Sequence, residues 1–445
     1  MPPQRRTVAR STDEILRGGE PLDPEGTLTE SDWLARRNDK LIPGPAFGDV
    51  VGISINRESI SWAIAGLGGS IATNRIDASI LPVRRNETAS PEQIETYVLQ
   101  ALGQIAENLP HDRIGGIGVA WPGPIAPDGE PRDYPHHHSG LRDHDVETLA
   151  LTPIIERALI GAGLAPGSSG PSGTGTPVRI EVIKDADADM LFELRHGVAK
   201  GRRNVMGLKV CGGIGMSIVH AGHIVRGGHG SAGEIQHIQV RYKEADKLSN
   251  WGELVGLEEL GPCTCSRTDC VGRFANGAAI IDQLANYFGD SNHLTPNERG
   301  RRIEEESTHG VVNSVFQRAG SLLGEAMVGP VVAFDPELLV VSAFPRNESL
   351  VDGIRTRLKK SHAYLSGEDD VIAGTPNTEG CNTTAMGAAR LVIERVFVPT
   401  IDRTLPSGGK PLSPGQLSAF LRHQLPDGVA DASDYNPAYG KLPPV

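Results

Sequence analysis

Three of the five cysteines lie between positions 263 and 270, and this cluster is the strongest local constraint on the fold of this 445-residue chain. Cys263, Cys265 and Cys270 have the spacing Cys-x-Cys-x4-Cys. An odd number of cysteines, clustered in this way, is not typical of a disulfide framework and favours a metal site in a reducing compartment. Three thiolates need a fourth ligand to complete the tetrahedral site that zinc prefers, and His237 lies upstream. The alternative is a group of buried free thiols.

The charge and hydropathy of the chain argue against several classes of protein. Lys and Arg number 43 against 55 Asp and Glu, so the formal net charge is -12. An acidic surface argues against a nucleic-acid partner. No run of about 18 apolar residues is present, so we expect no membrane span. The N-terminus is basic and then polar, without an apolar stretch of signal-peptide length, and therefore predicts a cytoplasmic protein.

Strand and helix patterns alternate along the chain, which is typical of an α/β protein. The length predicts two domains. A meander of three strands is expected at 49–55, at 59–65 and from 67 onward. Further strands are expected at 114–120, 178–183, 205–210, 216–220 and 338–341, and helices at 91–108, at 186–196 and over most of 277–346.

Composition sets the expected domain limits. Residues 1–46 are polar and charged, and predict an N-terminal arm that is too short and too polar for a winged-helix DNA-binding domain. Residues 161–177 form a Gly/Ser/Pro-rich insertion that has nothing to bury, and we expect it to be disordered. The expected order is therefore the arm, an N-terminal lobe over 47–183, a C-terminal lobe with the metal cluster over 184–397, and an extended tail over 398–445.

A second motif, Gly233-Glu234-Ile235-Gln236-His237, precedes the cysteine cluster. It resembles the Gly-Glu-Ile-Gly-His segment of the ROK family (repressors, open reading frames and sugar kinases), with Gln236 in place of Gly. The cysteine spacing is similar to the family's Cys-x-Cys-Gly-x-x-Gly-Cys, with Ser266 and Asp269 replacing the glycines. In that family the His and the three Cys bind structural zinc. The resemblance covers about 49–398 and implies a two-lobed α/β fold of the actin-like/hexokinase-like ATPase type, with a ligand cleft between the lobes.

Two further motifs resemble the sugar side of the ROK kinases. The stretch 118–125 is similar to the Gly-Val-Pro-Gly-Pro-Val loop that borders the sugar, and implies roles for Pro122 and Gly123. The stretch 184–188 reads Lys-Asp-Ala-Asp-Ala and resembles Asn-Asp-Ala-Asn-Ala, in which the Asp is the general base; Asp185 is therefore the candidate base. A plain helix N-cap is the alternative for Asp185. The resemblance also assigns Glu234, with His237 beside it, to the sugar.

Two positions on the sugar side depart from the family pattern. Lys184 replaces an Asn that hydrogen-bonds sugar hydroxyls, and a longer cationic side chain could pair with Asp185 or contact an anionic ligand. Gly272 stands where the kinases have another sugar-binding Glu, and Glu258 or Glu259 could replace it. The His136-His137-His138 tripeptide is not expected to bind metal, because adjacent side chains rarely converge on one ion.

The nucleotide side matches the family least. Where the kinases have Asp-x-Gly-Gly-Thr, this chain has Ser54-Ile55-Asn56-Arg57-Glu58, which lacks the magnesium-binding carboxylate and both glycines. Arg57 could still attract a phosphate. The second phosphate loop reads Cys211-Gly212-Gly213-Ile214-Gly215, so that the amides of Gly212, Gly213 and Gly215 could cradle an anion.

Three functions follow from these motifs. The first is an ATP- and magnesium-dependent kinase of a sugar or cyclitol hydroxyl, with Asp185 as the base. The second is a kinase-inactive, carbohydrate-binding or regulatory protein of the same fold. The third is an enzyme that uses Asp185 and Lys184 for different acid/base chemistry in the same cleft. Each implies a sugar-like ligand and a structural zinc, and the family implies a homodimer or homotetramer.

Overall fold

The structure is a computed structural model that describes most of the chain between positions 49 and 397. The described residues are 49–56, 59–66, 69–76, 91–109, 114–126, 129–131, 150–164, 178–242, 260, 262–263, 265, 267–284, 287–288, 294, 296–361, 364–365, 367, 369–377 and 382–397. The predicted arm and tail, the His136-His137-His138 tripeptide and Glu258 and Glu259 lie outside them.

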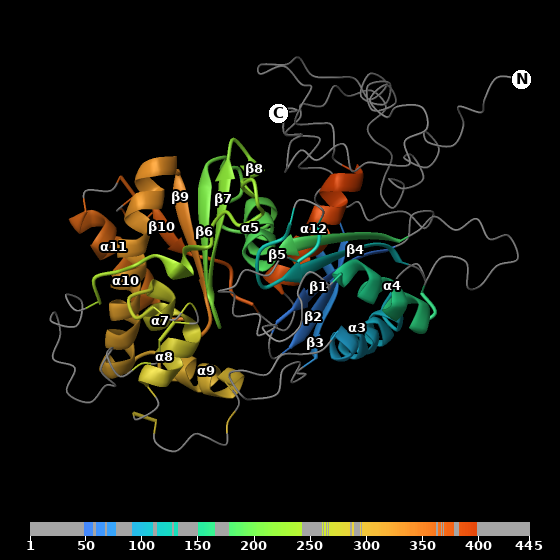
Figure 1. Ribbon diagram of the computed structural model, residues 1–445, viewed down its shortest axis with the longest axis horizontal. Helices are drawn as coiled ribbons and strands as arrows, with labels where there is room; N and C mark the ends of the chain where they lie inside the picture. The colour runs from blue at the N-terminus through green and yellow to red at the C-terminus, as the bar shows by residue number, and fades with distance from the viewer. Residues whose placement is uncertain are drawn as a thin grey trace, which may run out of the picture.

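The first lobe is built on a five-stranded sheet with the order β3-β2-β1-β4-β5 (Figure 1). Its strands β1 to β3 form an antiparallel meander, and β4 and β5 continue the sheet in parallel to β1. Helices α3 and α4 pack together beside this sheet, and their apolar faces join its core. The bounds are β1 Asp49–Ile55, β2 Ile60–Gly66, β3 Gly69–Ile76, α3 Pro91–Ala106, β4 Ile114–Trp121, α4 Leu151–Gly161 and β5 Arg179–Lys184.

The second lobe repeats this topology. Its sheet has the order β10-β9-β6-β7-β8, with β6 to β8 antiparallel and β9 and β10 parallel to β6. Strand β6 therefore takes the central place that β1 has in the first sheet. The strands are β6 Val205–Val210, β7 Ile214–His220, β8 His223–Ile224, β9 Leu338–Ala343 and β10 Val371–Ala373. The helices are η2 Ile235–His237, α7 Val271–Ala275, α8 Gly277–Gln283, α9 Pro296–Glu305, α10 Gly310–Phe334 and α11 Glu348–Lys360.

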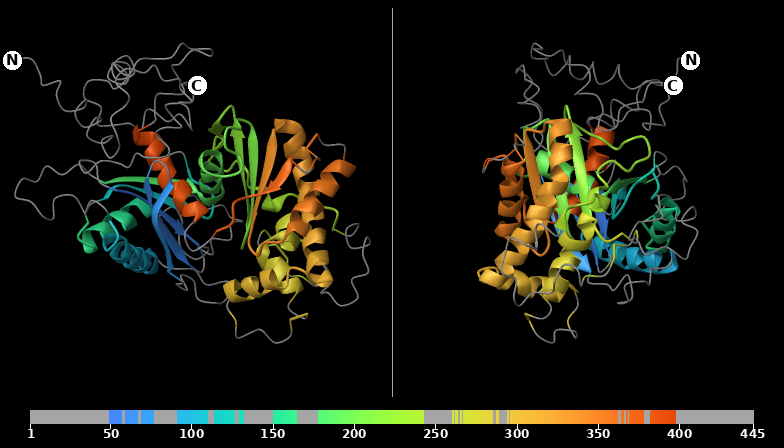
Figure 2. Two further views of the ribbon diagram at one scale, coloured as in Figure 1. Left: turned by 180° about the vertical axis from the view of Figure 1, so that it is seen from behind. Right: turned by 60° about the vertical axis from the view of Figure 1, so that its left-hand side comes forward.

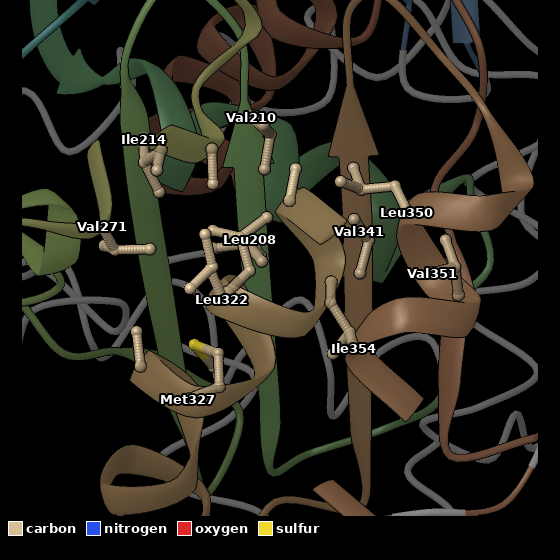
Figure 3. Close-up of a cluster of buried hydrophobic side chains, with 14 of the residues drawn as sticks. Leu208, Val210, Ile214, Val271, Leu322, Met327, Val341, Leu350, Val351 and Ile354 are labelled. Atoms are coloured by element: carbon tan, nitrogen blue, oxygen red, sulfur yellow. The ribbon is translucent and has the colours of Figure 1, made fainter. Parts of the chain in front are cut away.

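The core of the second lobe lies between its sheet and the pair α10 and α11. Figure 3 shows Leu208 of β6 and Val341 of β9 facing Leu322 of α10 and Ile354 of α11. All four side chains are buried. Burial of this apolar surface, at roughly 25 cal/mol per Å², is the main stabilising contribution to the lobe.

Two helices lie between the sheets, α5 Asp185–Arg195 and α12 Thr383–Phe397 (Figure 2). They pack on each other, and α12 also packs on β1 and β4 of the first sheet. The contact is close because it runs over glycines. A Cβ at Gly52 of β1 or at Gly118 of β4 would collide with the backbone carbonyl of Ala385 or Ala388 in α12.

Most predicted elements are present, and the two-lobed α/β architecture is confirmed. The strands expected at 49–55 and 205–210 have the predicted bounds. Helix α4 was missed, and the first residues of the predicted insertion, 161–164, end and cap it. The remainder of that insertion lies outside the described residues. The domain limits stay a prediction, to which the structure adds that α12, within 184–397, packs on the first sheet. Among the described helices none is long and apolar enough to span a membrane.

Candidate functional site

The His and Cys residues singled out in the sequence come together in space. One ligand atom from each of His237, Cys263, Cys265 and Cys270 lies within 4.8 Å of the others. Cys263 Sγ is 3.5 Å from His237 Nδ1, and the Sγ atoms of Cys265 and Cys270 are 3.3 Å apart. Sulfur ligands of one tetrahedral zinc lie about 3.8 Å apart, so the spacing fits a single ion.

The chemistry of these thiols also fits a cation. Burial, and then the neighbouring Cys265 and Cys263, raise the pKa of the Cys270 thiol above its ordinary value. Three thiolates at this spacing therefore repel one another unless a positive ion lies among them. The isolated bridge between Gln239 and Cys270 and the short helix η2 hold the two halves of the cluster together.

Asp185, the candidate base, is the first residue of α5. The N-cap residue is Lys184, so the N-cap alternative for Asp185 is not what the structure has, although Asp185 Oδ1 does accept a hydrogen bond of 2.7 Å from the amide of Ala186. The carboxylate lies beside the second phosphate loop, since Oδ1 would be 3.9 Å from a Cβ placed at Gly215.

A lysine that sequence reasoning missed is the ion-pair partner of Asp185. Lys209 Nζ lies 3.4 Å from Asp185 Oδ2 and 2.9 Å from Asp189 Oδ2. It also donates a 2.9 Å hydrogen bond to Thr384 Oγ1 of α12. Although burial opposes its charged form, Asp185 and Asp189 raise the pKa of Lys209 above its ordinary value. The group therefore carries a permanent buried cation against the candidate base.

A signal for Lys209 was present in the sequence. The strand reads Val-Met-Gly-Leu-Lys-Val, and a charged residue in an otherwise apolar, buried strand requires a partner of opposite charge. The identity of that partner could not be read from the sequence, because Asp185, Asp189 and Thr384 come from two other elements.

Lys184 does not pair with Asp185 in the structure. Its ammonium donates hydrogen bonds to the carbonyls of Met216, at 2.8 Å, and Ala232, at 2.5 Å. It lies 4.0 Å from Glu234 Oε1, the carboxylate assigned to the sugar by resemblance. Lys184 is 4% exposed and thus has little access to solvent.

The loop over Pro122 and Gly123 borders the same region. It follows β4, and Gly123 has a φ of 148°, which a residue with a side chain rarely adopts. The next part of this loop contacts the segment before Glu234, since a Cβ at Gly230 would collide with the carbonyl of Ile125. The loop after β4 and the segment before Glu234 are thus in contact.

The nucleotide side is only partly described. Arg57 and Glu58 lie outside the described residues, whereas Ser54 is fully buried near the end of β1 and its hydroxyl accepts a 3.4 Å hydrogen bond from Asn56 Nδ2. The second loop is a tight turn in which the Cys211 amide donates to the Gly213 carbonyl at 2.9 Å. A Cβ at Gly212 would meet no atom within 4 Å, so this part of the turn is open. Burial raises the pKa of the Cys211 thiol to about 11, which keeps it protonated.

Gln236 and Gly272, two positions that depart from the family pattern, lie next to each other. A Cβ at Gly272 would lie 3.1 Å from Cβ of Gln236 and 2.9 Å from its carbonyl oxygen. The buried Gln236 side chain extends toward the turn, where its Oε1 is 3.6 Å from the Cβ position of Gly213. Gln236, where the family has Gly, thus occupies space beside Gly272, where the kinases have Glu.

Comparison with known proteins places this architecture in a family. The profile of the ROK family matches residues 172–395, which is half of the chain. The chain belongs to the ROK family. Its matched part includes α5, the Lys209 strand and the four His and Cys residues.

Similar ROK proteins include both regulators and kinases. The chain is 22% identical over 365 residues to the xylose repressor of Bacillus subtilis, covering 81% of this chain and 80% of the repressor. A glucokinase of Halalkalibacterium halodurans is 26% identical over 182 residues, covering 37% of this chain and 48% of that enzyme.

Solved structures confirm the fold. A ROK family glucokinase from Streptomyces griseus, in complex with glucose and AMPPNP, has a TM-score of 0.52 at 20% identity, covering 77% of this chain and 99% of that one. A ROK family transcriptional regulator, a homologue of the Escherichia coli MLC protein, has a TM-score of 0.56 at 17% identity, covering 86% and 95%.

Proposed function

We propose that this chain is a sugar-binding ROK protein that does not transfer a phosphoryl group. The observation that carries this proposal is the ion pair of Lys209 with Asp185 and Asp189, at 3.4 Å and 2.9 Å. A general base must take a proton from the sugar hydroxyl in the transition state. Asp185 faces the Lys209 ammonium with Oδ2 and accepts the Ala186 amide with Oδ1, so both carboxylate oxygens already have partners where a general base must receive the hydroxyl proton.

The nucleotide side supports the same reading. A kinase of this fold needs a carboxylate for magnesium and glycines that let the backbone approach the phosphates. Ser54 stands in place of that carboxylate, and Asn56 follows in place of the first glycine. The Gln236 side chain lies beside the remaining glycine turn at Gly213. Each of these features disfavours a bound magnesium triphosphate.

We assign the ligand site to the residues that remain on the sugar side. The ligand is bordered by Glu234, Asp185, Pro122 and Gly123. By analogy with the relatives named above, this ligand is an uncharged sugar. A zinc ion would be held by His237, Cys263, Cys265 and Cys270. Four protein ligands leave no open coordination position for a substrate, so the role of this zinc is structural.

The remaining partners are part of the same proposal. We assign no nucleic-acid partner to the described lobes and place the protein in the cytoplasm, in line with the net charge of -12 and the clustered thiols. The assembly we propose is a homodimer or homotetramer.

One specific observation favours the alternative that this protein is a sugar kinase. Asp185 lies at the start of α5, beside the turn that contains Gly215, which is where a base must lie relative to a transferred phosphoryl group. In that case Asp185 would take the proton, the turn would hold the phosphates, and ATP and magnesium would be required.

One pair of measurements distinguishes a protein that only binds sugar from one that also phosphorylates it. Calorimetric titration of the full chain with xylose, glucose and N-acetylglucosamine should detect binding of at least one sugar. Release of ADP from magnesium-ATP in the presence of that sugar should stay at background, and Asp185→Asn should change the sugar affinity only modestly. Sugar-dependent turnover that is lost in Asp185→Asn, by about 10²–10⁴-fold, would establish the kinase instead.

A further inference from the structure

The chain passes between the two sheets at two places within its described part (Figure 2). The first connection is α5, which follows β5 of the first sheet and leads to β6 of the second. The second connection leaves β10 of the second sheet and leads to α12, which packs on the first sheet. A rotation of one lobe relative to the other must bend both connections, so contacts between the two determine how the lobes can move.

One face of α5 carries three acidic residues along its length. Asp185, Asp189 and Glu193 are spaced four residues apart, so their side chains lie on the same face of the helix, one turn after another. Asp189 and Glu193 are 6% and 1% exposed, whereas Asp185, at the start of the helix, is half-buried. A buried carboxylate is costly unless it accepts hydrogen bonds or faces a cation, so neighbouring elements must supply partners for the two buried ones.

Residues on both sides of the second connection supply these hydrogen bonds. Asp189 Oδ1 accepts from the hydroxyls of Thr384, at 2.5 Å, and Thr383, at 3.1 Å, which lie in the first turn of α12. Glu193 accepts from the amide of Thr375, at 2.6 Å, and from its hydroxyl, at 3.0 Å, in the segment that follows β10. The second connection is therefore bonded to α5 where it leaves β10 and where it enters α12.

The backbone around Glu193 leaves room for its carboxylate. A Cβ at Gly197 would collide with Glu193 Oε2, and a Cβ at Gly374 would lie 3.0 Å from Oε1. Oε2 also accepts a 2.8 Å hydrogen bond from the amide of Val198, just after α5. The carboxylate is thus enclosed between the end of α5 and the second connection, and both strands of chain approach it at a glycine.

Lys209 links this face of α5 to the ligand side. Its ammonium lies between Asp185 and Asp189 and donates to the hydroxyl of Thr384, which in turn donates to Asp189. Asp185 is the member of this network that also borders the proposed ligand. A sugar hydroxyl that donates to Asp185 takes up part of its negative charge, so Lys209 is then attracted more strongly to Asp189.

We propose that this face of α5 is a latch that joins the two connections between the lobes, and that a sugar bound at Asp185 tightens the latch through Lys209. The latch is formed by Asp189, Glu193, Lys209, Thr375 and Thr384. Because coupled equilibria are reciprocal, a change that loosens the latch must also weaken sugar binding. The coupling to sugar rests on the proposed function, whereas the latch itself does not.

Thr384→Val tests the latch, because it removes the bridging hydroxyl and keeps the shape of the side chain. Hydrogen–deuterium exchange of the full chain without ligand should become about tenfold faster or more in residues 383–390, since Lys209 and Asp189 each lose a partner. Exchange in β4 and β9 should stay unchanged. Thr384→Ser keeps the hydroxyl, is the matched control and should exchange like the wild type.

A second variant tests the other end of the latch. Thr375→Val removes one hydroxyl donor to Glu193 but keeps the amide donor. Exchange in residues 374–377 should therefore become faster by a smaller factor than exchange in 383–390 of Thr384→Val.

The coupling is measured with glucose, xylose and N-acetylglucosamine on the same proteins. A sugar that binds should slow exchange in residues 383–390 of the wild type but not of Thr384→Val. Thr384→Val should also weaken the calorimetric affinity for that sugar by about fivefold or more, although Thr384 is not among the residues assigned to the ligand.

The opposite results are equally specific. Thr384→Val that exchanges like the wild type would overturn the latch, and so would a uniform increase of exchange throughout both lobes, which indicates only a loss of global stability. If Thr384→Val does not fold, the same comparison for Thr375→Val decides. Equal protection by sugar in the wild type and in Thr384→Val would overturn the coupling. If the wild type binds none of the three sugars, the proposed function and the coupling both fail, while exchange without ligand still decides the latch.

Discussion

The two sheets share one topology but contact the helices between them in different ways. In the first sheet, Gly52 of the central strand β1 packs directly under the backbone of α12. In the second, Gly207 of the matching central strand β6 faces the side chain of Met190 in α5, 2.9 Å from the position of a Cβ. A methionine can change its rotamer, whereas a helix backbone cannot easily move. The central strand of the first sheet therefore meets its helix through backbone contact, and that of the second sheet through an adaptable side chain.

The ends of the central strands differ as well. Ser54 is the penultimate residue of β1 and Lys209 the penultimate residue of β6, and both are buried. The first is a small neutral group, whereas the second is a cation held by two carboxylates from α5. The matching ends of the two central strands thus carry different chemistry, although the two sheets share one topology.

Removal of the proposed zinc should give the largest effect, and it is specific to the second lobe. Chelation, or Cys270→Ser at a fully buried ligand, should lower the free energy of unfolding by several kcal/mol, because the ligand geometry then has no ion to hold it. Metal content by mass spectrometry and thermal unfolding with and without chelator measure this. Wild-type protein that is free of zinc and equally stable would contradict the assignment.

Substitution of Lys209 tests the difference between the ends of β1 and β6. Lys209→Met should cost about 3–5 kcal/mol, because the buried Asp189 and the half-buried Asp185 are left without their cation. Ser54→Ala at the matching place in β1 should cost only about 1 kcal/mol. Denaturant unfolding of both variants makes the comparison, and equal losses would show that Lys209 is not an essential partner of the two carboxylates.

The two glycines test the difference in packing directly. Gly52→Ala should cost about 3 kcal/mol, since β1 and α12 must separate to admit the methyl group. Gly207→Ala should cost about 1 kcal/mol, because the Met190 side chain can turn away. If urea unfolding shows the same loss for both, the second sheet is packed as rigidly as the first.

The smallest effect concerns pH, at the end of α5 between the lobes. His196 caps that helix, and burial lowers its pKa to about 4, below the ordinary value of 6.5. The unfolded chain binds a proton in this range before the folded one, so stability should decrease as the pH falls from about 6.5 to about 4. His196→Asn should remove about 1 kcal/mol of that decrease, after allowance for partial exposure. Thermal unfolding at pH 7 and pH 5 checks the difference.

The sequence predicted the strands and the metal cluster better than the candidate site. Strand alternation and cysteine spacing are local, so β1, β6 and the four-residue cluster could be placed without tertiary information. The partners of Lys184 and Lys209 could not, because their hydrogen bonds reach β7, α12 and the 226–234 segment. A long cationic side chain has many rotamers, and only the folded surroundings decide which one is used.

The contact of α12 with β1 also has a consequence during synthesis on the ribosome. Strand β1 ends at Ile55 and α12 begins at Thr383, which is 328 positions later in the chain. At about 5–20 residues per second, the nascent β1 waits roughly 16–66 seconds for the helix that covers it. During that time the glycine face of β1 and β4 is open to water and to other chains, and a product terminated before position 383 never covers it. Premature stop codons between β4 and α12 should therefore give aggregation-prone fragments, even when both sheets have been made in full.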